Sequence, residues 1–206
     1  MKVLVSGFEP FNNSGLNPSE EIVKMLPEKI GEAEIVKAYL PVSYFHSFDE
    51  LRKVIDNIHP DVVICLGLAN GRKAITPERI AINMNSASIA DNDGVKYIDD
   101  PIRRDGKCAY FSTLPIREMV EAMSEVVPAI ISNTAGTYVC NNIMFKVLEY
   151  VDHNCKAGFI HVPMMKGMKN DKGFYELEVE KMTEAIIKAI EVIVWWLLFW
   201  YNVKEE

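Results

Sequence analysis

A run of apolar residues in the first third of the chain constrains the fold most. Residues 61–66 have the sequence Asp-Val-Val-Ile-Cys-Leu, in which apolar and polar positions do not alternate. A strand of this kind is buried on both faces, which is typical of a parallel sheet covered by helices on both sides. The run therefore predicts an interior strand of a layered α/β domain.

The rest of the chain predicts strands that alternate with helices. Further strands or extended segments are expected at 2–6, 33–40, 74–84, 87–90, 129–132 and 159–162. Helices are expected at 17–26, 43–58, 115–126, 137–151 and 174–203. This order favours an α/β three-layer sandwich, a mostly parallel sheet between two layers of helices. Because no repeat or linker-like stretch divides the 206 residues, one domain covering 1–206 is expected.

Two local signals predict where elements begin and end. Gly7 is expected to end the first strand. Asn17 is expected to cap the first helix, since a proline follows it at the first helical position and a glutamate stands three residues after it.

Charge limits the classes of partner and ligand. The chain has 22 Lys and Arg against 29 Asp and Glu, a net charge of -7, and no long basic run. Nucleic acid is therefore not an expected partner. An acidic cluster spans residues 91–100, but its spacing matches no EF-hand loop, so the cluster is interpreted as solvated turns and no metal is expected.

The cysteines point to free thiols rather than to a disulfide or zinc framework. The chain has four widely spaced cysteines with no Cys-x-x-Cys pair and no Cys/His zinc spacing: Cys65, Cys108, Cys140 and Cys155. The N-terminus lacks the pattern of a signal peptide, because Gly7 interrupts its short apolar run. A cytoplasmic location is therefore expected.

Cys140 is the best candidate for a nucleophile. It follows a predicted strand and the loop Asn133–Gly136, so it is expected in the first turn of the next helix. There the unpaired backbone amides and the helix dipole favour a thiolate over a thiol. The alternative, a small buried residue without a chemical role, is about as probable on this evidence.

His161 is the candidate base. It stands near the end of the short apolar strand that Pro163 stops, so its side chain could face the same cleft as Cys140 and take the thiol proton. A hydrogen-bonded core histidine is the alternative, and it is favoured when this segment is taken alone. The other three histidines, His46, His59 and His153, are interpreted as surface residues.

Glu78 is the candidate for a third group that orients the imidazole. It lies between Pro77 and Arg79 inside an apolar extended segment, where an acid is out of place unless it is paired. A surface ion pair between Glu78 and Arg79 is equally compatible with the sequence.

Phe8 and Phe11 are expected in the loop that follows the first strand. Aromatic side chains at the carboxyl edge of such a sheet can form the walls of a small apolar pocket. Packing in the core is the alternative, and the pattern alone favours it.

Together these segments resemble the pyrrolidone carboxyl peptidases, also called pyroglutamyl peptidase I, a family of cysteine peptidases. The resemblance covers Val3 to Pro163 and rests on four blocks: Gly7–Phe11, Thr76–Asn83, Ser132–Asn141 and Gly158–Pro163. The third block is the most specific.

The resemblance implies a single α/β domain, and an enzyme that removes N-terminal pyroglutamate from peptides through a thioacyl intermediate without a cofactor. It assigns the catalytic triad to Glu78, Cys140 and His161. It assigns the pocket for the pyroglutamyl ring to Phe8, Phe11 and Val139. The chemistry is consistent with this, because a flat, neutral lactam suits aromatic faces and a few hydrogen bonds at its edge.

The chain departs from the family at two positions. Many members have Asp-Ala-Arg-Ile-Pro-Asp-Asn where this chain has residues 86–92, so Ser88 replaces an arginine thought to help at the oxyanion. Asn12 stands where glycine is common. The candidates to replace the missing cation are Arg72, Arg79 and Arg103.

These departures leave two other classes of function open. One is a pyroglutamyl-peptide binding protein with weakened catalysis. The other is a different hydrolase or a phosphorylase on a related α/β fold, although no glycine-rich phosphate loop or basic cluster supports it.

The end of the predicted terminal helix is strongly apolar. Residues 192–201 have the sequence Val-Ile-Val-Trp-Trp-Leu-Leu-Phe-Trp-Tyr, shorter than the roughly 20 residues that span a bilayer. A helix that is apolar all round needs cover on every side. One side is expected to pack on the chain's own sheet and the other against a second subunit, and the family often forms homotetramers.

Overall fold

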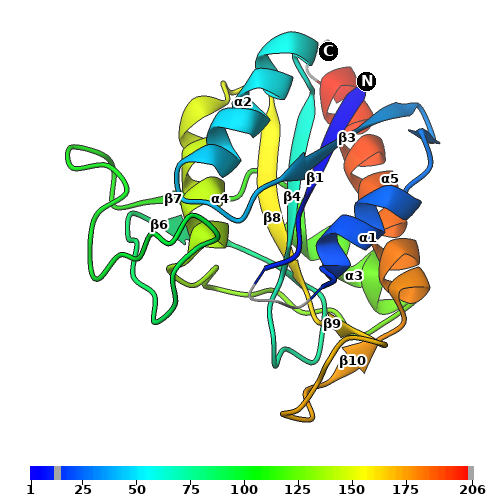
Figure 1. Cartoon of the computed structure of the whole chain (residues 1–206). Coiled ribbons are helices and arrows are strands. Elements are labelled where there is room, and N and C mark those ends of the chain that lie inside the picture. Colours follow the sequence, from blue (N-terminus) through cyan, green and yellow to red (C-terminus); the bar gives the residue numbers. More distant parts are fainter. Residues whose placement is uncertain (12–14, 204–206) are drawn as a thin grey trace.

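The computed structural model describes residues 1–11 and 15–203, with the side chains of residues 200–203 excepted. Its centre is a six-stranded sheet with the strand order β2-β3-β1-β4-β8-β5 (Figure 1). The strands of this sheet are β1 (Lys2–Phe8), β2 (Lys29–Ile30), β3 (Ala33–Leu40), β4 (Val62–Leu68), β5 (Thr76–Pro77) and β8 (Lys156–Val162). The four long strands β3, β1, β4 and β8 are parallel, and the two-residue strands β2 and β5 lie antiparallel at the edges.

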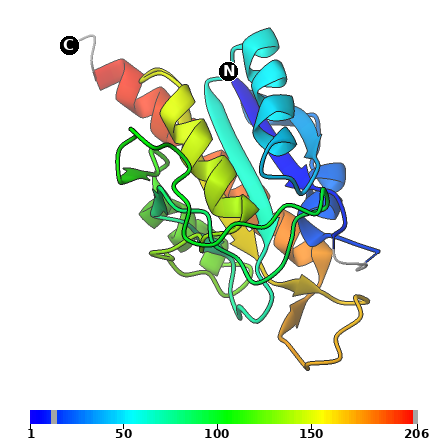
Figure 2. The ribbon, with the colours of Figure 1, turned by 60° about the vertical axis from the view of Figure 1, so that its left-hand side comes forward.

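Helices cover both faces of the sheet, as Figures 1 and 2 show. One face carries α1 (Pro18–Met25), α3 (Ile116–Ser124) and α5 (Val179–Val203), and the other carries α2 (His46–Ile58) and α4 (Val139–Tyr150). The predicted α/β three-layer sandwich with a mostly parallel sheet is confirmed.

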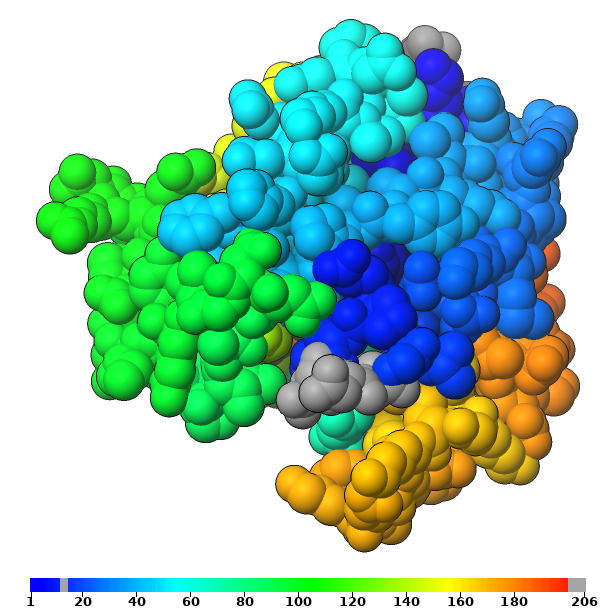
Figure 3. Space-filling view, viewed as in Figure 1, coloured from blue at the N-terminus to red at the C-terminus, as the bar shows by residue number. Residues whose placement is uncertain are grey.

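Two small sheets lie outside the central one. They pair β6 (Ile80–Ile82) with β7 (Ala109–Phe111), and β9 (Met164–Met165) with β10 (Glu176–Leu177). The long segment between β6 and β7 forms the projection at the left of Figures 1 and 3.

Alternation along the strands divides the interior into two cores. In β4, Ile64 belongs to the core under α1, α3 and α5, whereas Cys65 belongs to the core under α2 and α4. In β8, Ile160 belongs to the first of these cores and Phe159 to the second. His161 lies two residues after Phe159, so its side chain points toward the α2 and α4 face.

The first strand and first helix show one correct and one incorrect boundary. Asn17 caps α1 as predicted, because its side chain accepts a hydrogen bond of 3.1 Å from the backbone amide of Ser19. The prediction that Gly7 ends the strand is wrong, since β1 continues to Phe8. Gly7 is required instead for packing: a Cβ there would lie 2.4 Å from the carbonyl oxygen of Ser19.

Three other predicted elements differ from the structure. Residues 129–132 do not form a regular strand but only isolated bridges to the β5 region. Residues 87–90 are not a strand, and Ala87 bonds to Tyr97 across a loop. The terminal helix begins at Val179 rather than at 174, because residues 176–177 pair with β9 before the helix starts.

Candidate active site

The carboxyl ends of β4 and β8 bring the first site residues together. The parallel register pairs Gly67 with His161 and Cys65 with Phe159. Because side chains alternate along a strand, His161 and the open position at Gly67 lie on the same face of the sheet. This is the face that α4 covers, so the imidazole and the start of α4 share one side of the sheet.

Cys140 lies in the first turn of α4, as the sequence predicts, although the helix begins at Val139 rather than at 137. The next residue fixes this end of the helix: Asn141 is fully buried, its oxygen accepts from the backbone amide of Ile82 at 2.9 Å, and its amide donates to the carbonyls of Ile82 and Met84 at 2.8 and 2.9 Å. Sequence reasoning did not single out Asn141, although it lies in the most specific block of the resemblance.

Gly67 makes room for the thiol. A Cβ at Gly67 would lie 3.0 Å from Sγ of Cys140 and 2.6 Å from the ring of Phe159. The sulfur therefore lies against the backbone of β4 at the residue that is paired with His161. Sequence reasoning missed Gly67, and its only signal was a glycine inside an apolar strand.

Glu78 and His161 form a buried hydrogen-bonded pair. His161 Nδ1 lies 2.7 Å from Oε1 of Glu78, and the carboxylate side chain is fully buried. The backbone amide of Glu78 donates to the carbonyl of Phe159 at 2.8 Å, which aligns the two segments. The alternative of a surface pair with Arg79 is wrong, since Arg79 Nε donates to Oδ1 of Asn133 at 2.7 Å.

Arg72 bonds to the same carboxylate oxygen as His161. Its Nη1 lies 2.5 Å from Oε1 of Glu78 and also donates to the hydroxyl of Thr76. Its Nη2 donates to the carbonyl of Thr134 at 3.0 Å, in the loop that precedes α4. Arg72 was considered only as a cation that might replace the missing arginine, so its bond to Glu78 was not foreseen.

Burial controls protonation at the site. It raises the pKa of the Cys140 thiol to about 12, and the nearby Glu78 carboxylate acts in the same direction. Burial also lowers the pKa of His161, and the hydrogen bond that Glu78 accepts from the imidazole opposes this only in part. Burial thus opposes the thiolate that the helix start favours, and it shifts the pair toward a thiol and a neutral imidazole.

The three residues assigned to the pocket all belong to the core under α2 and α4. Phe8 and Val139 are buried and Phe11 is partly buried. Phe8 is the last residue of β1 rather than a loop residue, and its ring centroid lies 6.5 Å from that of Phe159, the strand neighbour of the imidazole. The three side chains therefore stand on the same face as Cys140 and His161.

Position 88 carries no cation at the thiol. Ser88 is exposed, although its segment is tied to the start of α4: the amide of Ser86 donates to the carbonyl of Thr137 at 2.8 Å, and the hydroxyl of Tyr138 donates to the carbonyl of Ala90 at 2.9 Å. Of the proposed substitutes, Arg103 pairs with Glu149 at 2.8 Å. Asn12 lies outside the described residues.

The acidic cluster contains one buried capping residue. Asp91 was interpreted as part of a solvated turn, which is wrong, because its carboxylate is buried and accepts from the backbone amides of Tyr44, Asp93 and Val95 at 2.8–3.0 Å. No group of three or more His, Cys, Asp or Glu side chains in the described part of the chain is arranged to hold a metal.

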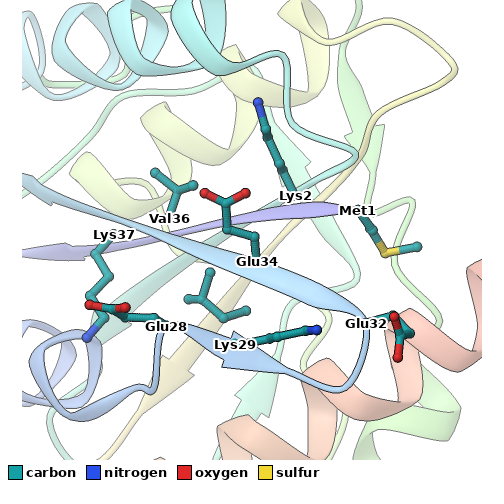
Figure 4. A pocket seen from close by; sticks show the side chains of 9 residues that line it. Met1, Lys2, Glu28, Lys29, Glu32, Glu34, Val36 and Lys37 are labelled. Carbon is teal, nitrogen blue, oxygen red and sulfur yellow. The ribbon is translucent and has the colours of Figure 1, made fainter.

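A pocket of about 810 Å³ lies away from these residues, near the amino ends of β1 and β3 (Figure 4). Charged side chains of both signs line it, among them Lys2, Glu34 and Lys37. None of the candidate triad residues lines it, because they lie at the opposite, carboxyl ends of the parallel strands.

The terminal helix has one covered and one exposed side. Trp196 packs against the core under α1, α3 and α5, whereas Trp195 is 65% exposed and Phe199 is 55% exposed. The rings of Trp195 and Phe199 stack on each other, with centroids 5.5 Å apart. The side chain of Trp200 lies outside the described residues. No helix in the described part of the chain has the length and apolar character needed to cross a membrane.

Known proteins match this chain over nearly its whole length. The family model for pyroglutamyl peptidase matches residues 1–195. A pyrrolidone-carboxylate peptidase from Streptococcus pyogenes serotype M12 is 47% identical over 199 residues, which cover 94% of this chain and 93% of the relative. The crystal structure of pyroglutamyl peptidase I from Bacillus amyloliquefaciens superposes with a TM-score of 0.90 at 38% identity, covering 93% of this chain and 96% of that one.

A mutant pyrrolidone carboxyl peptidase from Pyrococcus furiosus superposes with a TM-score of 0.91 at 42% identity. The match covers 96% of this chain and 100% of the Pyrococcus chain. Since the family model and the relatives all span nearly the whole length, the chain belongs to the pyroglutamyl peptidase family of cysteine peptidases.

Proposed function

We propose that this chain hydrolyses the bond after an N-terminal pyroglutamate in peptides, with Cys140 as nucleophile, His161 as acid and base, and Glu78 as the group that orients the imidazole. The observation that carries the proposal is the 2.7 Å bond between Glu78 and His161 on the face where the Cys140 sulfur lies. Membership of the family supports the same reaction.

The reaction begins with transfer of the thiol proton. Glu78 holds Nδ1 of His161, which leaves Nε2 free to take the proton of Cys140 as the sulfur attacks the pyroglutamyl carbonyl. The negative charge on the carbonyl oxygen is stabilised by the backbone N–H of Cys140, which has no intrahelical partner in the first turn of α4.

The intermediate is a thioester between Cys140 and the pyroglutamyl group. The imidazolium of His161 gives its proton to the leaving amine, so the shortened peptide departs with a free N-terminus. Neutral His161 then takes a proton from water, and the hydroxide equivalent cleaves the thioester to release pyroglutamate and restore the thiol.

Recognition of the substrate is assigned to Phe8, Phe11 and Val139. Pyroglutamate has no ammonium group, so recognition rests on a neutral, flat ring. Phe8, Phe11 and Val139 give that ring apolar surface on the face that carries the nucleophile.

The exposed Ser88 favours one alternative, a pyroglutamyl-peptide binding protein with weak catalysis. The loss of one hydrogen-bond donor at an oxyanion costs a factor of about 10²–10³ in rate. The triad would then be present but slow, and ligand affinity would exceed what turnover requires.

Hydrolysis of a pyroglutamyl chromogenic amide, beside the matching prolyl amide, tests the proposal. We expect turnover of the first only, and loss of nearly all activity in Cys140→Ala with an unchanged thermal unfolding curve. Mass spectrometry of the acid-quenched reaction should show pyroglutamyl on the peptide that contains Cys140. Activity that persists in Cys140→Ala contradicts the mechanism, whereas tight binding without turnover supports the alternative.

We further propose that the exposed side of α5 joins subunits into a homo-oligomer, a dimer or tetramer, in the cytoplasm. Trp195, Leu198 and Phe199 together form an apolar patch on one helix. Because a two-fold axis brings the same patch of both subunits together, this surface suits a symmetric contact. A reducing compartment also keeps the Cys140 thiol reactive.

A further inference from the structure

The charge of Glu78 is balanced unevenly between its two oxygens. Oε1 receives both His161 Nδ1, at 2.7 Å, and Arg72 Nη1, at 2.5 Å. Oε2 is buried and has no hydrogen-bond partner among the described residues. A buried carboxylate is costly unless a cation compensates it, and the Arg72 guanidinium supplies that charge.

Arg72 also connects this carboxylate to the start of α4. Its second nitrogen donates to the carbonyl of Thr134 at 3.0 Å, and α4 begins at Val139, five residues later. One planar side chain therefore contacts the acid of the triad and the loop that leads to the nucleophile. A guanidinium can make both contacts at once because its donors are held in a rigid fork.

We propose that Arg72 is a positioning residue for proton transfer between Cys140 and His161: it holds the Glu78 carboxylate in a fixed orientation, and it links that carboxylate to the loop before Cys140. This inference rests on the function proposed above. Arg72 acts through Glu78 and the loop, not by contact with substrate.

The electrostatics agree with this role. The charged groups that act on His161 are Glu78 and Arg72, and the Arg72 cation lowers the pKa of the imidazole. Cys140 is influenced by Glu78, Cys65 and Arg72, and the Arg72 cation lowers the thiol pKa. The hydroxyls of Tyr44 and Tyr138 also interact electrostatically with Cys140. Arg72 therefore keeps the imidazole neutral and ready to accept a proton, and it makes the thiol easier to ionise.

The test compares Arg72→Gln with Arg79→Gln. Arg79 is a matched control because its guanidinium bonds to Asn133 in the same loop, whereas the Glu78 carboxylate bonds to Arg72 and His161. In Arg72→Gln we expect kcat to fall about tenfold or more while KM changes little. Since the pKa of His161 rises when the cation is removed, the acid limb of kcat/KM should move to higher pH by about half a unit or more.

A second readout follows the thiol directly. The pH at which iodoacetamide alkylates Cys140, measured by peptide mass spectrometry, should rise in Arg72→Gln and stay unchanged in Arg79→Gln. If both variants share the wild-type pH profile and alkylation curve, the inference fails, even where kcat falls. If wild-type protein has no activity that Cys140→Ala removes, the proposed function fails instead.

Two further measurements apply if Arg72→Gln unfolds. Arg72→Lys keeps the charge and should return the acid limb of kcat/KM to its wild-type pH. Its kcat should stay low, because a single ammonium group cannot bond to Glu78 and Thr134 at the same time. A pocket of about 340 Å³ is lined by Arg72, Lys73 and Ser132 and gives access from outside. Added guanidinium should therefore raise kcat of Arg72→Ala but not that of Arg79→Ala. A wild-type kcat in Arg72→Lys, or equal responses of the two alanine variants, overturns the inference.

Discussion

The first turn of α4 and the last described turns of α5 are both helix ends, but they are built in opposite ways. At α4, Asn141 makes three hydrogen bonds to the backbone and Cys140 lies in a space left by Gly67. At α5, Trp195 and Phe199 lie exposed and contact each other. In Figure 2 this end of α5 extends past the neighbouring elements.

The difference indicates a separate role for each of these two helix ends. Buried polar groups need partners with defined geometry, so the bonds around Asn141 hold the thiol in one position. Contacts between exposed apolar side chains do not require a defined direction. The stacked pair of Trp195 and Phe199 can therefore pack against any apolar surface of complementary shape. Substitutions at α4 should therefore change catalysis, and substitutions at α5 should change assembly.

The largest effect is expected from His161→Ala. Removing the base should lower kcat by about 10²–10⁴, while Glu78→Gln, which keeps the side-chain shape, should lower it less and leave KM nearly unchanged. In the wild type the acid limb of kcat/KM should lie below the ordinary histidine pKa of about 6.5, because burial lowers the pKa of His161. Steady-state kinetics from about pH 5 to about pH 9 measure the fall in kcat and the position of the acid limb. An acid limb well above that value contradicts the neutral resting imidazole.

The next effect is expected from Gly67→Ala. The new Cβ would lie 2.6 Å from the Phe159 ring and 3.0 Å from the sulfur of Cys140, so the thiol must move. We expect a kcat loss of about 10–100-fold and a destabilisation of about 1–3 kcal/mol. Gly136→Ala, at a left-handed turn with nothing near its Cβ, is the comparison: it should cost stability without moving the sulfur. Wild-type kcat in Gly67→Ala contradicts the placement of the thiol.

A gain is expected from Ser88→Arg. The segment around position 88 is bonded to Thr137 and Tyr138, so a long cationic side chain there can reach the oxyanion near Cys140. We expect kcat to rise by up to about tenfold, with KM changing less. Ser88→Gln supplies length without charge and should have little effect. Unchanged or lower kcat in Ser88→Arg contradicts the view that the arginine missing at position 88 limits the rate.

The smallest effect on catalysis is expected from the double variant Trp195→Ser and Phe199→Ser. Sedimentation at micromolar concentration should show a smaller species than the wild type, while kcat per chain stays within about twofold. Phe111→Ser removes another strongly exposed phenylalanine, at 66% exposure, and should leave the assembly unchanged. A wild-type protein that sediments as a monomer contradicts the proposed role of α5.

The sequence by itself determined the layers of the fold and selected the candidate site residues. The unbroken apolar run of β4 required a sheet covered on both faces, and Asn17 set the start of α1, because both signals act within a few residues. Cys140, His161 and Glu78 could be selected because their types and local positions are unusual.

Only the tertiary structure decided what surrounds those residues. Gly67 matters because β4 lies beside β8, and Arg72 matters because its loop meets Glu78 and Thr134, which no local pattern records. The rise in the pKa of the Cys140 thiol could not be foreseen for the same reason: a helix start is a local feature, whereas desolvation depends on everything packed around the sulfur.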